Sequence, residues 1–280
     1  MSNIRTINKI ITGERATDGA GVKLVRVIGY DDTQDFDPFL MMDAFDSVNP
    51  NDYTKGFPWH PHRGIETVTY LIKGDIEHGD NLGNKGSILD GDCQWMTAGS
   101  GIIHQEMPKR SEWLFGVQLW LNLPAKDKMV SPQYRGIQKH DIPIVDEEDS
   151  KVHIIAGNYK GIPGALEGDY VKPLYFDVEV KKDREWTFET EEDSTLFIYI
   201  LQGEGFFDPQ NEAFISEKHA VLFNKGKDFR VKASNQGIRF LLLSGKPLKE
   251  PIAWGGPIVM NTREELDLAF KELNENKFVK

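Results

Sequence analysis

Cysteine is almost absent from this sequence: Cys93 is the single one among 280 residues. One thiol cannot form an internal disulfide or a cysteine-rich zinc cluster, so a small secreted fold held by disulfides is excluded. Cys93 also lacks a sequence neighbour that would indicate a nucleophilic thiol, and we expect it to be packed in the core and inert. The thiol count favours a reducing compartment, and we expect a cytoplasmic protein.

Long apolar segments are also missing. A membrane-spanning helix needs about 20 apolar residues in a row, whereas the strongest apolar stretches, Phe39–Met42 and Phe240–Leu243, have the length of strands. Residues 1–15 lack the continuous apolar region of a secretory signal. We therefore expect neither membrane insertion nor export.

Positive charge is in deficit. The sequence has 33 Lys and Arg residues against 44 Asp and Glu residues, a net charge of −11, which argues against direct binding of nucleic acid. The motifs of P-loop and dinucleotide binding and the G-x-S-x-G motif of serine hydrolases are absent. With 39% hydrophobic and 28% charged residues, the composition is that of a folded globular protein and not of a disordered chain.

Most apolar segments are short, rich in β-branched and aromatic residues, and bounded by Gly, Asp, Asn or Pro, which is typical of strands and turns. The clearest predicted strands are Val22–Ile28, Glu66–Ile72, Trp113–Leu121, Val152–Ile155, Leu174–Val180, Leu196–Leu201, Val221–Phe223 and Ile238–Leu243. The 26 glycines and 14 prolines supply the turns between them. The pattern predicts an all-β protein.

One helix is predicted, at the C-terminal end. Thr262 and Glu265 have the spacing of a capping box. Apolar residues then recur at helical spacing, at Leu266, Ala269, Phe270 and Leu273. The polar face mixes acidic, amide and basic side chains, which favours packing on the β core over binding to a membrane surface.

An internal repeat indicates two similar domains. The segment from Tyr70 to Asp75 resembles the segment from Tyr199 to Glu204, and each is a strand that runs into a glycine turn. Together with the chain length, the repeat predicts two β-barrels. We expect one barrel over residues 1–124 and a second over 170–280, which includes the C-terminal helix, with a loop-rich linker over 125–169.

Histidine is scarce, at seven residues, yet four metal-capable side chains come in two closely spaced pairs. His60 and His62 flank a proline, and His104 precedes Glu106 by two residues. In an extended chain residues i and i+2 project from the same face, so each pair offers two ligands in one direction. If both strands line one barrel interior, three imidazoles and a carboxylate meet there, a set that suits a divalent transition metal and leaves positions for water or substrate.

Each pair taken alone also fits a simpler interpretation, in which the histidines are exposed or satisfy hydrogen bonds. The two pairs together favour the metal site. In the second repeat the positions that correspond to His60 and His62 are Glu189 and Glu191, so we expect the second barrel to lack a comparable metal set. The other histidines are expected to be surface or hydrogen-bonding residues: His78, His140, His153 and His219.

Two segments carry a resemblance to a known family. They are GFPWHPHRG at residues 56–64 and QWMTAGSGIIHQEMP at residues 94–108. Both resemble motifs of the pirin family of the cupin superfamily. The resemblance extends over nearly the whole chain, through DPFL at residues 37–40, QLW at 118–120 and GPIVMNT at 256–262.

The resemblance implies two cupin barrels and one divalent transition metal in the N-terminal barrel, held by His60, His62, His104 and Glu106. The metal of the family is usually taken as iron, so Fe(II) is expected, with Mn, Co, Ni, Cu and Zn as alternatives. Several pirins are similar in activity to quercetin 2,3-dioxygenases, which open the central ring of a flavonol with O2 and release carbon monoxide. A nuclear relative is regarded as a transcriptional co-regulator.

Three functional hypotheses follow. The first is a metal-dependent dioxygenase with a flavonol-like substrate and O2, in which Glu106 is the candidate base and Phe57, Trp59 and Met96 form apolar pocket walls. Arg63 orients a carboxylate, stacks on an aromatic group or makes a buried structural ion pair. The second hypothesis is a non-catalytic metal- or redox-sensing protein that binds a protein partner. The third is a two-cupin enzyme with another reaction, such as isomerisation. We expect a monomer.

Overall fold

The computed structural model describes residues 3–208 and 213–280, and its chain divides into two compact units. Unit 1 comprises Met1–Gly13, Gln34–Pro38 and His140–Pro247, and unit 2 comprises Glu14–Thr33, Phe39–Lys139 and Leu248–Lys280. Unit 1 is formed mainly by the C-terminal half of the chain but also contains Met1–Gly13. Unit 2 is formed mainly by the N-terminal half but also contains Leu248–Lys280. The contiguous domain ranges 1–124, 125–169 and 170–280 stay a prediction. The two compact units differ from these ranges because each includes a segment from the other end of the chain.

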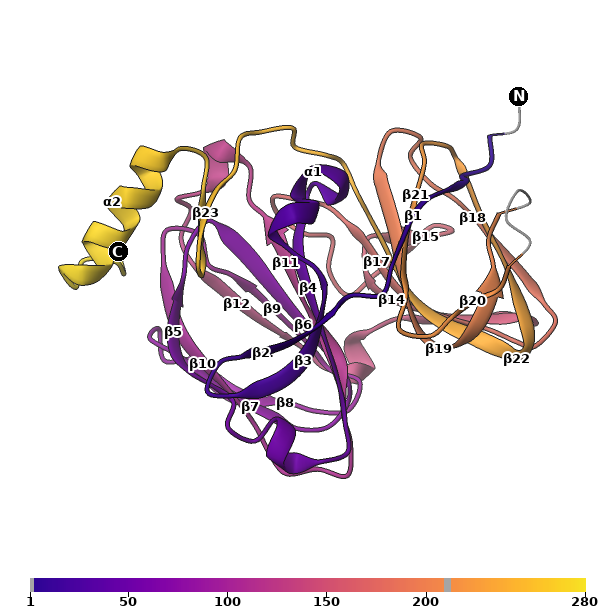
Figure 1. Ribbon diagram of the computed structural model, residues 1–280, viewed down its shortest axis with the longest axis horizontal. Helices are drawn as coiled ribbons and strands as arrows, with labels where there is room; N and C mark the ends of the chain where they lie inside the picture. The colour runs from indigo at the N-terminus through magenta and orange to yellow at the C-terminus, as the bar shows by residue number, and fades with distance from the viewer. Residues whose placement is uncertain (1–2, 209–212) are drawn as a thin grey trace. The chain divides into compact units, whose positions relative to one another are not determined.

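Unit 2 contains two antiparallel sheets (Figure 1). The larger sheet has the strand order β12 (Gln133–Ile137), β9 (Cys93–Thr97), β6 (Ile65–Lys73), β11 (Leu114–Asn122), β4 (Phe39–Ser47), β3 (Val22–Ile28) and β2 (Glu14–Asp18). The smaller sheet has the order β5 (Phe57–His62), β10 (Ile102–Pro108), β7 (Ile76–Asp80) and β8 (Lys85–Ile88). Glu106 on β10 accepts hydrogen bonds from Thr69 on β6 and Gln118 on β11. The inner faces of the two sheets therefore meet and enclose a barrel interior.

The C-terminal segment of unit 2 adds a hairpin and a helix. The hairpin consists of β23 (Ala253–Gly255) and β24 (Ile258–Met260), and the helix is α2 (Arg263–Asn274), drawn in yellow in Figure 1. The predicted capping box is present: the Thr262 side chain accepts from the backbone N–H of Glu265, and the Glu265 carboxylate accepts from the backbone N–H of Thr262. Leu266 and Ala269 are buried and pack in one cluster with Ile258 and Met260. The predicted helix and its packing on the β structure are thus both present.

Unit 1 is built on one nine-stranded antiparallel sheet. Its main path is β1 (Ile7–Ile11), β21 (Ala220–Phe223), β19 (Thr195–Phe206), β22 (Asp228–Gly245), β17 (Leu174–Val180), β14 (Ser150–Ala156) and β13 (Ile144–Asp146). Two further strands pair with it, β18 (Glu185–Glu189) with β22 and β20 (Ile215–Ser216) with β19. The short strands β15 (Asn158–Tyr159) and β16 (Ile162–Pro163) form a separate hairpin, and α1 (Thr33–Phe36) is a single turn.

Seven of the eight predicted strands lie within observed strands, and the eighth, Trp113–Leu121, begins one residue before β11, so the all-β prediction is confirmed. Val22–Ile28 and Leu174–Val180 coincide with β3 and β17. The prediction Ile238–Leu243 was too short, because β22 continues through the polar residues before it and pairs with β18 in its first half and with β17 in its second. The range 125–169 is more than a loop: it supplies β12 to unit 2 and β13 and β14 to unit 1.

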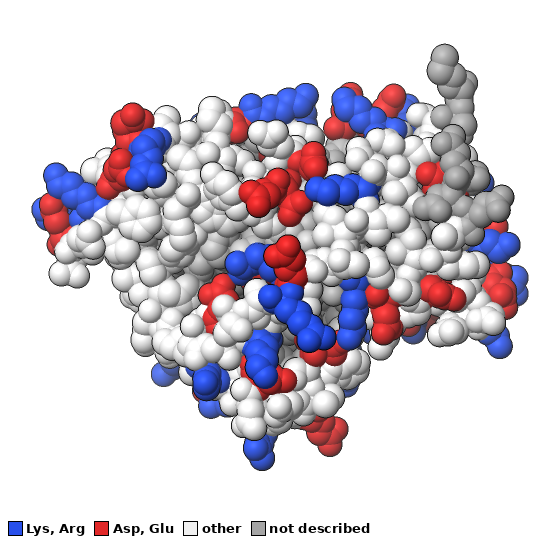
Figure 2. Space-filling model, viewed as in Figure 1, with Lys and Arg blue, Asp and Glu red and all other residues white. Residues whose placement is uncertain are grey.

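The molecular surface carries both signs of charge. In Figure 2 the blue Lys and Arg side chains lie interspersed with red Asp and Glu side chains over the face in view. Among residues 3–208 and 213–280, no helix has the length and apolar content needed to cross a membrane.

Candidate metal centre

The candidate site is built on two neighbouring strands of the smaller sheet in unit 2. Strands β5 and β10 are antiparallel, with His60 directly opposite His104 and His62 opposite Ile102. Along β10, buried residues alternate with half-exposed ones, and both His104 and Glu106 are on the buried face. The register shifts between His104 and Glu106. The extra residue lies on β5, where three steps from His60 to Phe57 face two steps on β10. Strand β10 keeps regular pairing with β7, so Glu106 stays on the same face as His104.

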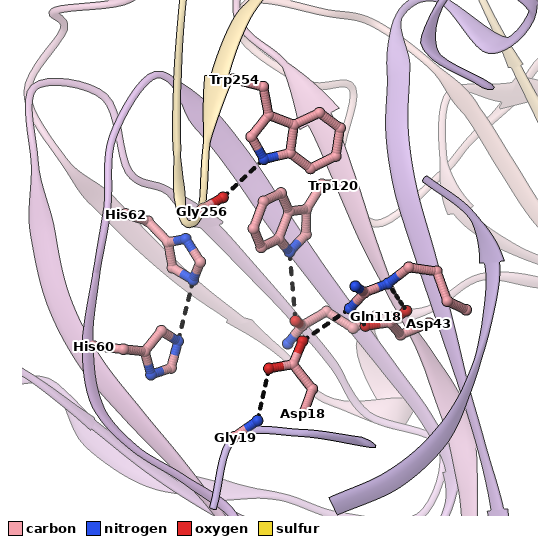
Figure 3. Close-up of polar contacts among 10 residues, drawn as sticks. Asp18, Gly19, Asp43, His60, His62, Gln118, Trp120, Trp254 and Gly256 are labelled. Carbon is pink, nitrogen blue, oxygen red and sulfur yellow. Dashed lines mark hydrogen bonds and ion pairs between the residues drawn. The ribbon is translucent and has the colours of Figure 1, made fainter. Parts of the chain in front are cut away.

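The structure brings three imidazoles together. The ring nitrogens offered by His60, His62 and His104 all lie within 4.8 Å of one another. Figure 3 shows His60 and His62 turned toward each other, with 3.1 Å between their Nε2 atoms. Each Nδ1 lies within hydrogen-bond distance of a backbone carbonyl, that of Pro58 at 2.8 Å for His60 and that of Pro257 at 3.1 Å for His62. A carbonyl only accepts, so Nδ1–H donates, and the Nε2 lone pairs point into the site.

The environment of these imidazoles fits a bound cation. His104 Nε2 is buried and has no hydrogen-bond partner among the described residues. Burial, together with the neighbouring imidazoles, lowers the pKa of His62 to about 3 and lowers the pKa of His104 well below its ordinary value. Neutral imidazoles with converging lone pairs are the form that binds a divalent transition metal. The three nitrogen donors therefore fit such an ion.

Glu106 lies beside this group and is held by other contacts. Its Oε1 accepts from Thr69 Oγ1 at 3.1 Å, and its Oε2 accepts from Gln118 Nε2 at 2.6 Å. The carboxylate is outside the set of ligand atoms that lie within 4.8 Å of one another. Burial raises the pKa of Glu106, against the opposing effects of His60 and the two hydrogen bonds. The structure thus places Glu106 next to the imidazoles as a buried carboxylate with raised proton affinity.

A cavity of about 700 Å³ opens onto His60 and His62. Its volume is in the range of pockets for small organic molecules. Two of the three predicted wall residues, Phe57 and Trp59, line it. Met96 does not, because its side chain is buried in a cluster with Leu40, Ile65 and Trp120.

Several residues of the cavity were not predicted. Gln118, Trp120, Trp254 and Pro257 all line it. The segments QLW and GPIVMNT carried part of the family resemblance, and this was the available signal. Their placement depends on register across β11 and on the return of the C-terminal hairpin to unit 2, which local sequence does not specify.

Two buried cations hold the C-terminal segment against the barrel of unit 2. Lys128 Nζ donates to the carbonyl oxygens of Gly64 and Val259, at 2.8 and 2.9 Å, and to Asn122 Oδ1. Gly64 follows the strand that carries His62, and Val259 lies in β24 just after Pro257. Lys128 therefore ties the ligand-bearing strand to the hairpin whose Pro257 carbonyl orients His62.

Arg63 is the second buried cation. Its Nε donates to the carbonyl of Ser100, its Nη1 to Glu272 Oε2 at 2.7 Å, and its Nη2 to the carbonyl of Phe278. The guanidinium also lies 4.2 Å from the centre of the Phe278 ring. Of the roles considered for Arg63, the structure shows the buried ion pair with Glu272 together with the contact to the Phe278 ring, and both hold the C-terminal segment.

The remaining histidines and the thiol are outside the group of three imidazoles. His78 is buried on β7, where its Nε2 is 2.6 Å from the Tyr134 hydroxyl. His140 is exposed, and His153 on β14 and His219 are half-buried. Cys93 is fully buried, and burial raises the pKa of its thiol, in agreement with an inert residue. Within the described part of unit 1, no group of three His, Cys, Asp or Glu ligand atoms is gathered as in unit 2.

Comparison with known proteins identifies the family. Residues 21–121 match the pirin family, and residues 175–279 match the pirin C-terminal cupin domain. A pirin-like protein of Caulobacter vibrioides is 40% identical over 278 residues, which cover 98% of this chain and 99% of the relative.

Two solved structures show the same fold. A quercetin 2,3-dioxygenase from Acinetobacter baumannii superposes with a TM-score of 0.88 at 32% identity, covering 98% of each chain. A bacterial pirin of Escherichia coli, solved in complex with nickel(II), has a TM-score of 0.67 at 17% identity, covering 85% of this chain and 98% of that chain, and shows the fold alone. With two cupin domains and full-length similarity to a pirin-like protein, this chain belongs to the pirin family.

Proposed function

We propose that this protein is a metal-dependent dioxygenase that opens the central ring of a flavonol-like substrate with O2 and releases carbon monoxide. The observation that carries the proposal is the convergence of three imidazoles beside a cavity of about 700 Å³ that has aromatic walls and is lined by His60 and His62. The walls include Trp120 and Trp254, whose ring centres are 5.7 Å apart, and both suit a flat aromatic ligand. The similarity to a quercetin 2,3-dioxygenase over 98% of each chain supports the same reaction.

The proposed cofactor is one divalent metal, with Fe(II) as the physiological ion. His60, His62 and His104 would hold it through their Nε2 atoms, and the nickel(II) complex of a structurally similar pirin supports a divalent ion in this fold. When bound, such a metal supplies Lewis-acid chemistry and, for a redox-active ion, electron transfer to activate substrate and O2.

The protein residues contribute orientation and proton transfer. Glu106 is the proposed base, because its raised pKa makes the carboxylate a better acceptor for the proton of a substrate hydroxyl than an ordinary glutamate. Thr69 and Gln118 each donate to one of its oxygens and so hold the carboxylate in place. The Pro58 and Pro257 carbonyls hold His60 and His62 in the tautomer that keeps Nε2 free. The aromatic walls exclude water around the ligand.

The test is aerobic turnover of quercetin by protein loaded separately with Fe(II), Mn(II), Co(II), Ni(II) and Cu(II). O2 uptake and carbon monoxide release are followed together, and bound metal is measured for each preparation. We expect carbon monoxide in stoichiometric amounts with at least one metal and none from the His62→Ala variant. The matched control is His140→Ala, because His140 is an exposed histidine of unit 1 and its loss leaves the three imidazoles intact.

Two results would contradict the proposal. Metal binding without O2 uptake for any metal would refute the dioxygenase and leave a metal-sensing role that recruits a protein partner as the better hypothesis. Unchanged metal stoichiometry in both His62→Ala and His104→Ala would refute the assignment of the imidazoles as ligands.

A further inference from the structure

The same cavity contains an ion-pair cluster that the proposed reaction does not use. Arg26 on β3 makes a two-pronged contact with Asp43 on β4, with 2.9 Å from Nε to Oδ1 and 2.9 Å from Nη2 to Oδ2. Its Nη2 also donates to Asp18 Oδ2 at 2.8 Å. Arg26, Asp43 and Asp18 all line the cavity. In Figure 3, Asp18 and Asp43 lie on one side of the cavity, and His60 and His62 lie on the other.

Strand register places this cluster at the end of a row of polar side chains. Arg26 is opposite Asp43, Asp43 is opposite Gln118, and Gln118 is opposite Thr69, across four adjacent strands of the larger sheet. Thr69 and Gln118 are the residues that hold Glu106. The strand of Arg26 is two strand spacings, about 10 Å, from that of Gln118. A ligand that lies along this row has the imidazoles and Glu106 at one end and the ion-pair cluster at the other.

The cluster, which lines the cavity, retains hydrogen-bonding capacity. Arg26 Nη1 makes no hydrogen bond to the described residues, so its two N–H groups are available. The two oxygens of Asp18 each accept one hydrogen bond, from Gly19 N–H and from Arg26, and each keeps a lone pair. The side chains of Arg26 and Asp18 are 35% and 51% exposed, so a ligand can reach both.

The charge of the cluster selects the kind of group that fits. One guanidinium faces two carboxylates, which leaves one net negative charge. Hydrogen bonding to Asp43 raises the pKa of Arg26, so the guanidinium stays charged. A carboxylate or phosphate would meet this net negative charge and is disfavoured. A hydroxyl group both donates and accepts, so it can donate to Asp18 while it accepts from Arg26 Nη1.

The turn that carries Asp18 is held in place. Gly19 has φ +58°, and a Cβ at this position would lie 2.6 Å from the Gly56 carbonyl oxygen, so the turn packs directly against the start of β5. The backbone N–H of Ala20 donates to the same carbonyl at 2.9 Å. Asp18 is therefore positioned before any ligand binds, which reduces the entropic cost of binding.

We propose that Asp18 and Arg26 form a polar subsite that binds vicinal hydroxyl groups on an aromatic ring, at the end of the cavity away from the imidazoles. The nearby aromatic walls suit the ring itself, since Tyr30 lies 5.7 Å from Trp254, centre to centre. The proposal rests on the proposed function for the identity of the rest of the ligand. It adds a preference within that substrate class: flavonols whose distal ring carries two adjacent hydroxyls bind better than flavonols whose distal ring carries none.

The test compares two ligands that differ only in these hydroxyls, 3-hydroxyflavone and 3,3′,4′-trihydroxyflavone. Dissociation constants are measured by calorimetry on protein loaded with Zn(II), which has no redox chemistry, so that binding is read without turnover. We expect the trihydroxy compound to bind about tenfold more tightly to the wild type, as two added hydrogen bonds would give. In Asp18→Ala the ratio of the two constants should fall to about threefold or less. The matched control Asp31→Ala makes the same charge change at an exposed residue outside the cavity and should keep the wild-type ratio.

An unchanged ratio in Asp18→Ala would overturn the subsite, and it is also the result expected if the adjacent hydroxyls bind the metal instead. If neither flavonol binds, the proposed function fails. The subsite is then tested separately, with small fragments in place of flavonols. For that purpose 4-methylcatechol and 4-methylanisole are compared by ligand-observed NMR on metal-free protein. Binding of the catechol that weakens in Asp18→Ala would support the subsite, and equal signals from the two fragments would overturn it.

Discussion

In unit 1 aromatic side chains fill the interior, with Trp186, Phe229 and Phe240 all at most 4% exposed and in mutual ring contact. In unit 2 buried positions of the barrel hold His62, His104 and Glu106 beside a cavity. Ring packing contributes mainly to stability, because each buried aromatic residue removes a large apolar area from water. Buried polar groups contribute little net stability, so a cupin barrel that carries them has its interior organised for binding.

The internal repeat shows how small the sequence difference is. Thr69, which donates to Glu106, corresponds to Ile198 in the repeat, and Ile198 belongs to the apolar core cluster of unit 1. His60 and His62 correspond to Glu189 and Glu191. Glu189 is the last residue of the short strand β18, and Glu191 follows that strand. The same strand pattern therefore supports both an aromatic interior, as in unit 1, and an interior with buried polar groups, as in unit 2. Individual side chains decide which of the two forms.

The largest effect is expected from a substitution in the aromatic interior of unit 1, which tests whether the two interiors are independent. Phe229→Ala should lower the free energy of unfolding by about 3–5 kcal/mol, because it removes a fully buried ring and leaves a cavity. Bound metal per chain should be unchanged, since all three imidazoles lie in unit 2. Chemical denaturation and metal analysis measure the two quantities. Phe214→Ala, at a 48% exposed ring of the same unit, is the control and should cost less than about 0.5 kcal/mol. Loss of metal in Phe229→Ala would show that the two interiors are not independent.

The next test acts on the orientation of a ligand histidine. Lys128→Met keeps the length of the side chain and removes the hydrogen bonds to Gly64, Asn122 and Val259. The hairpin that bears Pro257 should loosen, and metal affinity should fall by about 10–100-fold, as for other supporting contacts of metal ligands. Titration calorimetry with Zn(II) measures this. Lys126→Met, at an exposed position of the same turn, should bind metal as the wild type does. Equal affinities in the two variants would mean that the C-terminal hairpin does not position His62.

A pH dependence is expected from the ion pair of Arg63 with Glu272. Hydrogen bonds from Lys280 and Arg63 lower the pKa of Glu272, so the unfolded chain binds its proton more readily than the folded chain. The resulting stability is present above about pH 4.5 and is lost as the pH falls below it. Glu272→Gln should cost about 1–2 kcal/mol of unfolding free energy at pH 7, and this difference from the wild type should shrink toward pH 3. The exposed Glu275 provides the control Glu275→Gln, and a difference that does not vary with pH would contradict the assignment.

The smallest effect concerns the helix cap. Thr262→Ala removes the side chain that accepts from the Glu265 N–H and should cost about 1 kcal/mol of unfolding free energy. Thr262→Ser retains the hydroxyl and should restore most of it. Thermal unfolding of the three proteins measures the difference. A cost below about 0.3 kcal/mol would show that burial of the apolar helix face, and not the cap, holds α2.

Local sequence patterns predicted part of the fold. Short β-branched and aromatic segments between turn residues located the eight strands, because each strand buries its apolar side chains. The capping box and helical spacing located α2 at its correct start. The two-residue spacing of His60 with His62 and of His104 with Glu106 was also a local pattern, and it depends only on the alternation of side chains along a strand.

What the sequence by itself determined, then, is eight of the strands, the C-terminal helix and the candidate ligand pairs, since each depends on contacts between near neighbours. Only the tertiary structure decided that β5 and β10 are adjacent, that Thr69 and Gln118 donate to Glu106, and that Met96 faces a core and not the cavity. It also decided that residues 248–280 pack on unit 2 and bring Pro257 to His62. These features join residues up to about 200 positions apart, and no short-range pattern specifies such pairings because the free energy that selects them comes from the whole packed unit.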